Sequence, residues 1–256
     1  MILVITNQKG GVGKTTTAVN LSACLASAGK RVLLVDTDPQ GNATTGLGLD
    51  KRALEKSVYN VLVNGESFHD VIVPTATENL SIAPSNIDLA GAEVELVSMM
   101  ARETILCRAL KEVSEEYDFI IIDSPPSLGL LTLNALAASD QVVIPIQCEY
   151  YALEGLSQLM NTIKLVRKHL NPSLEIEGVV LTMFDSRTNL AVQVVDEVRS
   201  YFGSKVHKAI IPRNVRLGEA PSHGLPISEY DDKCSGADAY HRLAEEVIEQ
   251  SAPCNE

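Results

Sequence analysis

The sequence predicts an α/β fold, built as a doubly wound and mostly parallel β-sheet with helices on both faces. Short, continuously apolar runs recur along the chain, as expected for parallel strands that are buried on both faces. Longer segments with helical spacing separate these runs, as in repeated βαβ units. Six runs are predicted as strands, at residues 2–6, 31–36, 119–123, 141–146, 177–184 and 206–211.

Helical spacing fills most of the intervals between these strands. The predicted helices cover residues 15–29, 89–116, 128–138, 153–170, 190–202 and 236–250. Gly29 and Gly203 stand where two of these helices should end. Residues 37–88 are richer in Gly, Asn, Thr and Pro, so we expect loops with short elements there and not a second domain. No repeat or low-complexity tract interrupts the pattern, and we expect a single domain over residues 1–256, with a frayed tail at 251–256.

Composition restricts the classes of function. The chain of 256 residues has 45% apolar residues, enough for a buried core, and a formal net charge of −12. This acidity argues against a basic surface over the whole protein, so any nucleic-acid site should be a local patch. The five cysteines form no C-x-x-C pair, which indicates reduced thiols and neither disulfides nor a metal site. Without a leader or a long apolar stretch, we expect a cytoplasmic protein with no membrane association.

A glycine-rich segment, QKGGVGKTTT at residues 8–17, directly follows the first predicted strand and opens the first predicted helix. Its glycines let the backbone approach a polyphosphate, so that N–H groups and the helix N-terminus face the anion. Lys14 would neutralise the β- and γ-phosphate oxygens, and Thr15 would ligate Mg²⁺. The segment therefore predicts binding of ATP or ADP with Mg²⁺. The expected nucleotide-binding residues here are Lys9, Gly10, Gly11, Val12, Gly13, Lys14, Thr15 and Thr16.

Acidic residues follow two other predicted strands. Asp36 and Asp38 lie in VLLVDTDPQGN at 32–42, and Asp123 ends the strand at 119–123. Open parallel sheets bind ligands at the carboxyl ends of their strands, so these side chains should meet the glycine-rich loop. Asp123 would hold Mg²⁺ through water. Together these groups predict phosphoryl transfer to water, driven by positioning and charge neutralisation.

Lys9, just before the glycines, is the signature residue of the deviant Walker A family of ATPases, which this segment resembles. That family includes ParA, MinD and the nitrogenase iron protein. The resemblance implies that Lys9 reaches across a dimer to the other subunit's nucleotide, so that ATP binding and dimerisation are one event. It also implies that Asp38 orients the attacking water and that Asp36 gives support near Mg²⁺. The expected catalytic residues are then Lys9, Lys14 and Asp38, and the expected metal-binding residues are Thr15, Asp36 and Asp123.

The second half of the chain resembles chromosomal ParA/Soj proteins, above all in the stretches TMFDSRTNLAVQVVDEVRSYFG and KVHKAIIPRNVRLGEAPSHGLPISEYD. With the earlier motifs, the resemblance covers residues 1 to about 250. It implies that Pro212 and Asn214 contact the adenine base, and an Asn amide has the donor and acceptor needed to read an adenine edge. Met183 is a weaker candidate for the same pocket, because a Met that ends an apolar strand usually belongs to the core.

The resemblance also implies nonspecific contacts of Arg187 and Arg216 with the DNA backbone. Local charge agrees, because residues 184–216 hold six Arg or Lys and three acidic residues. One departure lies near the C-terminus, where many relatives have Pro-Lys-Ser-Arg-Gly and this chain has Asp-Lys-Cys-Ser-Gly at 232–236. This segment is therefore less basic than in those relatives.

The implied function is that of an ATP-hydrolysing chromosome or plasmid partitioning protein associated with the nucleoid. An ATP-dependent homodimer would bind double-stranded DNA nonspecifically, and a ParB-type centromere-binding protein would stimulate hydrolysis and so release the dimer. We expect slow hydrolysis without the partner. No strong general base lies close to the motifs, and the first histidine of the chain is His69.

Two alternative functions are those of other members of the same family, and a third is not enzymatic. A MinD-like septum-positioning ATPase needs a basic amphipathic C-terminal helix, whereas HRLAEEVIEQSAPCNE at 241–256 is acidic. An iron protein needs cysteines for its cluster, and the loop after Asp123 has none. A nucleotide-gated DNA-binding regulator with negligible turnover stays open, because motifs do not report rates.

Overall fold

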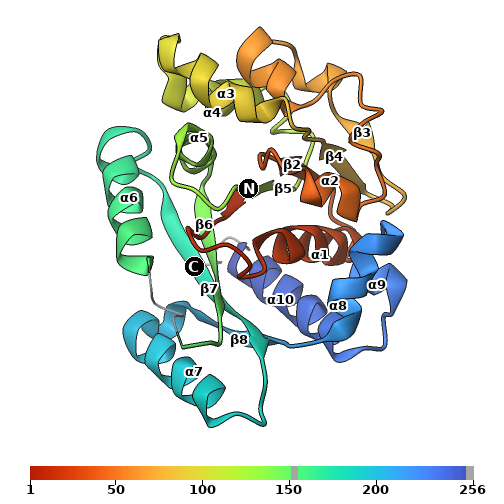
Figure 1. Cartoon of the computed structure of the whole chain (residues 1–256), viewed down its shortest axis with the longest axis vertical. Helices are drawn as coiled ribbons and strands as arrows, with labels where there is room; N and C mark the ends of the chain where they lie inside the picture. Colours follow the sequence, from red (N-terminus) through yellow and green to blue (C-terminus); the bar gives the residue numbers. More distant parts are fainter. Residues whose placement is uncertain (151–154, 252–256) are drawn as a thin grey trace, which may run out of the picture.

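One eight-stranded sheet forms the centre of the molecule (Figure 1). The computed structural model describes residues 1–150 and 155–251. The strands are β1 (Ile2–Ile5), β2 (Val32–Asp36), β3 (Val73–Pro74), β4 (Leu80–Ala83), β5 (Phe119–Asp123), β6 (Gln141–Gln147), β7 (Glu175–Phe184) and β8 (Val206–Pro212). Their order across the sheet is β3-β4-β2-β5-β1-β6-β7-β8. Neighbouring strands run parallel, except that β3 and β4 are antiparallel at one edge.

Helices connect the strands and cover the sheet. The α-helices are α1 (Lys14–Ser27), α2 (Asn42–Gly46), α3 (Leu89–Glu95), α4 (Ile105–Leu110), α5 (Leu130–Ala138), α6 (Leu156–His169), α7 (Asn189–Phe202), α8 (Val215–Glu219), α9 (Ile227–Tyr230) and α10 (Ser235–Ser251). Short turns of π or 3₁₀ helix are η1 (Asn60–Asn64), η2 (Phe68–Asp70), η3 (Leu96–Ser98), η4 (Arg102–Thr104), η5 (Gly203–Lys205) and η6 (Ala220–His223).

Each face of the sheet has its own apolar core. In β1, Val4 lies in the core under α5, α6 and α7, whereas Leu3 and Ile5 lie in the core under α1 and α10. Figure 1 shows these two layers of helices on opposite sides of the strands. Because successive side chains of a strand point to opposite faces, a strand between two cores must be apolar at every position. This explains the continuous apolar runs of the sequence.

The register of the three central strands aligns their carboxyl ends. Ile5 at the end of β1 pairs with Asp123 at the end of β5, and Asp123 pairs with Asp36 at the end of β2. The glycine-rich loop leaves β1 at this same edge of the sheet. The fold thus brings together the three segments that the sequence analysis connected with nucleotide.

The structure confirms the α/β class and the six predicted strands, and it corrects two details. Residues 37–88 contain β3 and β4 as well as loops, and β4 pairs with β2 inside the sheet. The predicted helix at 89–116 is broken between α3 and α4, where Met99 is extended and Ala101 has a positive φ of 51°. α1 and α7 end just before Gly29 and Gly203, as predicted. Residues 153–154 of the predicted helix at 153–170, and 252–256 of the predicted tail, lie outside the described residues.

Candidate functional site

The loop between β1 and α1 is held in a tight curve at the carboxyl edge of the sheet. The Thr182 hydroxyl on β7 donates to the Val12 carbonyl (2.8 Å), which fixes the loop to a neighbouring strand. Gly13 has φ of +88°, a left-handed conformation that suits glycine, and it directly precedes the first residue of α1. The Thr17 N–H closes the first helical turn on the Gly13 carbonyl (2.8 Å). The loop and the N-terminus of α1 therefore curve around one space, as anion binding requires.

A cavity of about 380 Å³ joins this loop to the segment after β2. The cavity therefore brings the loop and the predicted water-orienting residue Asp38 together. Asp36 and Asp123 are fully buried behind this surface. The lining residues are Gly10, Gly11, Gly13, Lys14, Thr15, Thr16, Asp38, Gln40, Asn42, Pro126 and Met183.

Lys14 is almost fully buried, with 6% of its surface exposed. Its Nζ donates to the carbonyl of Lys9 across the loop (3.0 Å). Burial lowers the pKa of Lys14, while the nearby charges of Asp123 and Asp38 oppose that decrease. Lys14 thus sits between a buried carboxyl group and the cavity, where a bound anion would stabilise its charged form.

Asp123 is the most unusual acid of the site. It is fully buried, and neither of its carboxylate oxygens has a hydrogen-bonding partner of good geometry among the described residues. Its pKa is raised well above the ordinary value, first by burial and then by the charge of Asp36, while Thr15 and Lys14 act in the opposite direction. Buried polar atoms are nearly always satisfied, so such an exception indicates a missing ligand.

Mg²⁺ fits these residues. Carboxylate and hydroxyl oxygens, here from Asp123 and Thr15, are the hard ligands that this ion prefers. In residues 1–150 and 155–251 no three His, Cys, Asp or Glu side chains gather as a metal site. A nucleotide-bound Mg²⁺ does not need such a group, because phosphates and waters supply most of its ligands.

Asp36 and Asp38 have different surroundings. The Asp36 carboxylate accepts hydrogen bonds from the Thr44 N–H (2.9 Å), the Thr44 hydroxyl (2.7 Å) and the Asp38 N–H (3.1 Å). Its pKa is raised to about 6, chiefly by burial, which these hydrogen bonds oppose. This arrangement favours Asp36 as a support for the loop over direct support of the metal. Asp38 accepts the Gln40 N–H on its carboxylate (2.9 Å) and lines the cavity.

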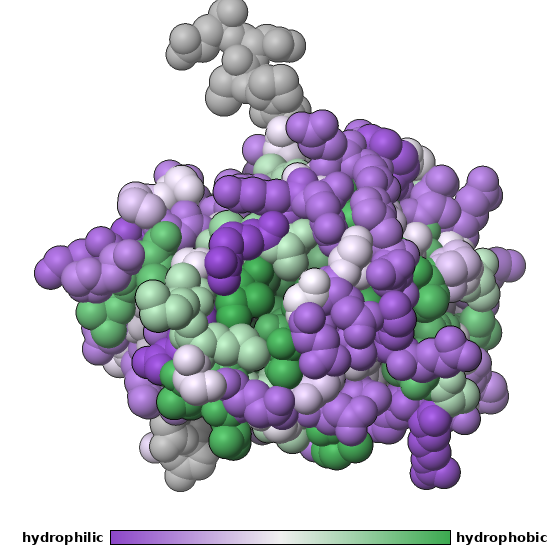
Figure 2. Space-filling model, turned by 90° about the horizontal axis from the view of Figure 1, so that it is seen from above, coloured by the Kyte–Doolittle hydropathy of each residue, from purple (hydrophilic) through white to green (hydrophobic). Residues whose placement is uncertain are grey.

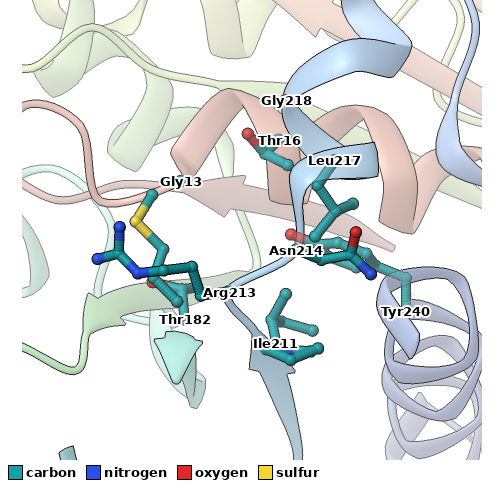
Figure 3. Close-up of a pocket in the computed structure, with 11 residues that line it drawn as sticks. Gly13, Thr16, Thr182, Ile211, Arg213, Asn214, Leu217, Gly218 and Tyr240 are labelled. Atoms are coloured by element: carbon teal, nitrogen blue, oxygen red, sulfur yellow. The ribbon is translucent and has the colours of Figure 1, made fainter. Parts of the chain in front are cut away.

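A second cavity, of about 230 Å³, adjoins the first (Figure 3). The predicted base-pocket residues Met183, Pro212 and Asn214 all line it. Tyr240 of α10 closes one side, and its hydroxyl lies 3.2 Å from that of Thr17 on α1. Gly13, Thr16 and Met183 line both cavities, so the two spaces form one continuous site. The lining residues that the sequence analysis missed are Thr182, Ile211, Arg213, Leu217, Gly218 and Tyr240; no local pattern marks them.

Asn214 and Met183 differ from the expectation in detail. The Asn214 amide forms two hydrogen bonds within the protein. Its Oδ1 accepts the Arg216 N–H (2.8 Å) at the start of α8, and its Nδ2 donates to Ser235 Oγ (3.1 Å). One hydrogen and one lone pair of the amide remain to contact a base. Met183 has a positive φ of 53°, a costly conformation for a residue with a side chain. Such strain is typical of functional sites, which strengthens the case for Met183.

Lys9 lies beside the phosphate cavity and not in it. Its N–H donates to Asn7 Oδ1 (3.0 Å), and its side chain lines a separate hollow of about 540 Å³ together with Glu149, Asp185 and Arg213. This hollow shares Met183 with both cavities, so Lys9 lies at the border of the site. This placement agrees with a role toward another subunit, which stays a prediction.

Arg187 and Arg216 are at the surface but engaged in ion pairs. Arg187 contacts Asp185 through two hydrogen bonds, from Nε (2.8 Å) and from a terminal nitrogen (2.7 Å). Its side chain is 84% exposed. Arg216 contacts Glu219 (2.9 Å) and Asp231 (3.4 Å). Much of the basic charge that the sequence places at 184–216 is therefore balanced locally by carboxylates.

An apolar surface lies beside the loop after Asp123. The carboxylate of Glu93 on α3 is so close to Gly129, where that loop meets α5, that a side chain at Gly129 would collide with it. Val94 in α3 and Met100 after it are 76% and 90% exposed. Figure 2 looks down on this end of the molecule, and hydrophobic side chains show there between hydrophilic ones. Within the described ranges, no helix has the length and apolarity to cross a bilayer.

Comparisons with known proteins extend beyond the motifs. A family model described as an AAA domain matches residues 1–176. The chain is 65% identical to the sporulation initiation inhibitor protein Soj of Bacillus subtilis over 246 residues, which cover 96% of this chain and 97% of that protein. It is 57% identical to the chromosome partitioning protein ParA of Myxococcus xanthus over 252 residues, which cover 98% of this chain and 89% of that protein.

Solved structures point in the same direction. Cobyrinic acid a,c-diamide synthase from Mycobacterium smegmatis matches with a TM-score of 0.86 at 40% identity, over 96% of this chain and 93% of that one. That protein has been solved with bound ADP and magnesium, and with an ATP analogue and magnesium. The similarity therefore covers the glycine-rich loop, the sheet and the base cavity together.

Proposed function

Because this chain belongs to the ParA/Soj family of chromosome-partitioning ATPases, we propose that it hydrolyses ATP slowly and uses the hydrolysis cycle to bind and release DNA. The observation that carries this proposal is the continuous site of two cavities. One cavity is lined by Lys14, Thr15 and Asp38, as phosphates require, and the other has the apolar and amide groups that suit a purine base. Gly13 and Thr16 line both cavities, which supports one nucleotide with its phosphates in the first cavity and its base in the second.

In this proposal each buried group has one role. Lys14 neutralises the β- and γ-phosphate oxygens, and the loop N–H groups hold their positions. Mg²⁺, when bound, would add positive charge against the transferring phosphoryl group, held by the Thr15 hydroxyl and, through water, by Asp123. Asp38 orients the attacking water. No residue that lines the cavity is a histidine, and the slow turnover expected from the sequence follows from this absence.

We include an ATP-dependent homodimer in the proposal. Glu93 of α3 lies next to Gly129 in the loop that follows Asp123, which would respond to nucleotide, and Val94 and Met100 nearby in the sequence are exposed apolar residues. Lys9 lies beside the cavity of its own subunit, where it would reach a partner's nucleotide. Size-exclusion chromatography with light scattering should show a dimer with ATP and Mg²⁺ and a monomer with ADP. Lys9→Ala should remain a monomer with either nucleotide.

DNA binding and release complete the cycle. Arg187 and Arg216 would contact phosphates without reading sequence, and a dimer would bring two such patches to one duplex. A ParB-type protein would accelerate hydrolysis, and the acidity of the chain would help to attract a basic segment of that partner. The protein would then be found in the cytoplasm on the nucleoid.

The test is retention of nonspecific duplex DNA with ATP, with ADP and without nucleotide, repeated at rising salt. We expect binding only with ATP, a decrease with salt, and loss of binding in Arg187→Glu. Arg108→Glu makes the same change of charge on exposed α4, at the opposite end of the molecule from α7 in Figure 1, and should bind as the wild type does. DNA retention that does not depend on nucleotide, or an equal loss of retention in both variants, would reject the proposed DNA-binding cycle.

The alternative of a DNA-binding regulator with negligible turnover is decided by phosphate release. Wild type with ATP, Mg²⁺ and duplex DNA should release phosphate steadily, and Asp38→Ala should release much less while it still binds nucleotide. Equal release from the two proteins would favour the regulator, since the measured phosphate would then not come from this site.

A further inference from the structure

A closed ring of hydrogen bonds holds the main chain of Asp38 in place. Asp38 donates its N–H to Asp36 Oδ1 (3.1 Å), and Asp36 Oδ2 accepts the Thr44 hydroxyl (2.7 Å). The Thr44 Oγ1 atom in turn accepts the N–H of Ser85 (2.9 Å). Ser85 closes the ring, because its hydroxyl donates to the Asp38 carbonyl (2.8 Å). The Asp38 N–H is therefore held by Asp36 and its carbonyl by Ser85, which precedes α3 and comes from another part of the chain.

The ring is shielded from water. Asp36, Thr44 and Ser85 are each fully buried, and Asp38 is 6% exposed. Hydrogen bonds that exclude water and include a carboxylate are stronger than exposed neutral ones. Ser85 comes two residues after the end of β4, a strand that pairs with β2, so the sheet itself fixes its position.

Close contact adds a second constraint on the same segment. Gly41 follows Asp38 with a positive φ of 59°, and an added Cβ there would lie 2.7 Å from the Ser85 carbonyl oxygen. The Gly41 N–H also donates to the Asp38 carbonyl (2.9 Å). The segment that carries Asp38 thus rests directly on Ser85, both by hydrogen bonding and by packing.

We propose that Ser85 is a positioning residue for ATP hydrolysis, which acts by fixing the backbone of Asp38. This rests on the proposed function, in which the Asp38 carboxylate orients water. A carboxylate must hold its position closely to align a nucleophile, and small misplacement from outside the site slows the reaction. Ser85 touches neither cavity, so its removal should change the rate and leave nucleotide affinity intact.

The experiment compares Ser85→Ala with wild type in two measurements: the dissociation constant of a nonhydrolysable ATP analogue, and single-turnover hydrolysis with Mg²⁺ and duplex DNA. We expect kcat to fall about tenfold, with affinity changed less than about twofold. Ser85→Cys, with a weaker donor of similar size, should lie between the two. The matched control is Ser139→Ala, which removes another buried serine hydroxyl that donates to a backbone carbonyl (2.7 Å, to Ala135) away from the site. It should lose comparable stability and keep its rate.

A double variant tests whether Ser85 acts through Asp38. Ser85→Ala combined with Asp38→Ala should be no slower than Asp38→Ala alone, whereas two additive losses would overturn the proposal. An unchanged kcat in Ser85→Ala, while Asp38→Ala is slow, would overturn the role of Ser85 and leave the ATPase function standing. A wild-type rate in Asp38→Ala would reject both.

Thr44→Val provides a second way to open the ring, should Ser85→Ala not fold. It removes the hydroxyl that joins Asp36 to Ser85. We expect the same pattern of a lower kcat at unchanged affinity. A Thr44→Val protein that loses stability but keeps its rate would contradict the positioning role.

Discussion

Two groups of buried charged side chains lie at opposite ends of the strands of one sheet, and they have different partners. At the carboxyl ends, Asp123 has two buried oxygens without partners of good geometry among the described residues. Near the amino ends of β7 and β8, His207 contacts Glu177 through Nε2 (2.8 Å) and Glu246 through Nδ1 (3.1 Å). In the second group one oxygen of Glu177 also lacks a partner within the described ranges, but both nitrogens of His207 contact a carboxylate.

The second group also ties α10 to the sheet. Glu246 accepts the N–H groups of Lys208 (2.9 Å) and Ala209 (2.7 Å) in addition to its contact with His207. Burial by itself lowers the pKa of His207, but the hydrogen bonds and charges of Glu177 and Glu246 outweigh burial, and the pKa is raised. We conclude that burial of charge does not by itself mark a functional site, because the carboxylates of the second group bind a histidine of the protein itself.

The largest expected effect is on stability, at the paired group. His207→Leu would leave the carboxylate of Glu177, which is 2% exposed, buried without its partner, and removing one member of such a pair costs about 3–5 kcal/mol of unfolding free energy. Urea unfolding measures this loss. His69→Leu is the control, because His69 forms an exposed pair with Glu116, and its loss should be below about 1 kcal/mol. Similar losses of unfolding free energy in His207→Leu and His69→Leu would contradict a special role for the buried group around His207.

The opposite result is expected at the unpaired group. Asp123→Asn removes a carboxyl group that burial disfavours, so the unfolding free energy without nucleotide should be equal or higher. Hydrolysis should fall by about 100-fold or more, the scale on which one preorganised charged contact contributes to a rate. Urea unfolding and phosphate release on the same preparation check both parts. A less stable Asp123→Asn with normal hydrolysis would reverse the assignment of the two groups.

The pH dependence of stability sharpens the comparison. A raised pKa in the folded state means that the stabilisation by His207 is fully present below the ordinary value of 6.5 and is lost as pH rises through the raised value. The difference in unfolding free energy between wild type and His207→Leu should therefore shrink above pH 6.5, by about 1.4 kcal/mol for each pH unit that separates the two pKa values. Urea unfolding from pH 6 to pH 9 measures it. A difference that grows with pH would contradict the raised pKa.

The smallest effect is expected where charges are paired but exposed. Asp185→Asn frees Arg187 from its carboxylate partner, and duplex DNA retention with ATP at low salt should increase by about threefold, because exposed pairs are weak. Asp238→Asn, which breaks the exposed pair with Arg242 on α10, is the matched control and should leave retention unchanged. Equal gains in both variants would indicate a general effect of net charge, with no local masking of Arg187.

The sequence predicted the fold class and the chemical end of the site because both depend on local patterns. Continuous apolar runs indicate buried parallel strands, and the residues around Lys14, Asp38 and Asp123 follow such runs directly. β4 was not predicted because Ser81 interrupts its apolar run and Pro84 follows it in a polar region. Ser85 was missed for the same reason, since its role depends on which strand lies beside β2.

Long-range contacts explain the remaining gaps. Nothing near Tyr240 in the sequence indicates that its hydroxyl meets Thr17, which is 223 positions away. The ion pairs of Arg216 likewise depend on how α8 packs beside Asp231. Charge counts along the chain therefore suggested a more basic surface than the folded protein has.

The same contact between Tyr240 and Thr17 has a consequence for how the protein is made. The glycine-rich loop is among the first parts of the chain to be synthesised, and α10 is among the last. A nascent chain that ends before Tyr240 possesses the phosphate loop but lacks one wall of the base cavity. If the proposed site binds nucleotide, we expect full affinity only once α10 has been synthesised and folded.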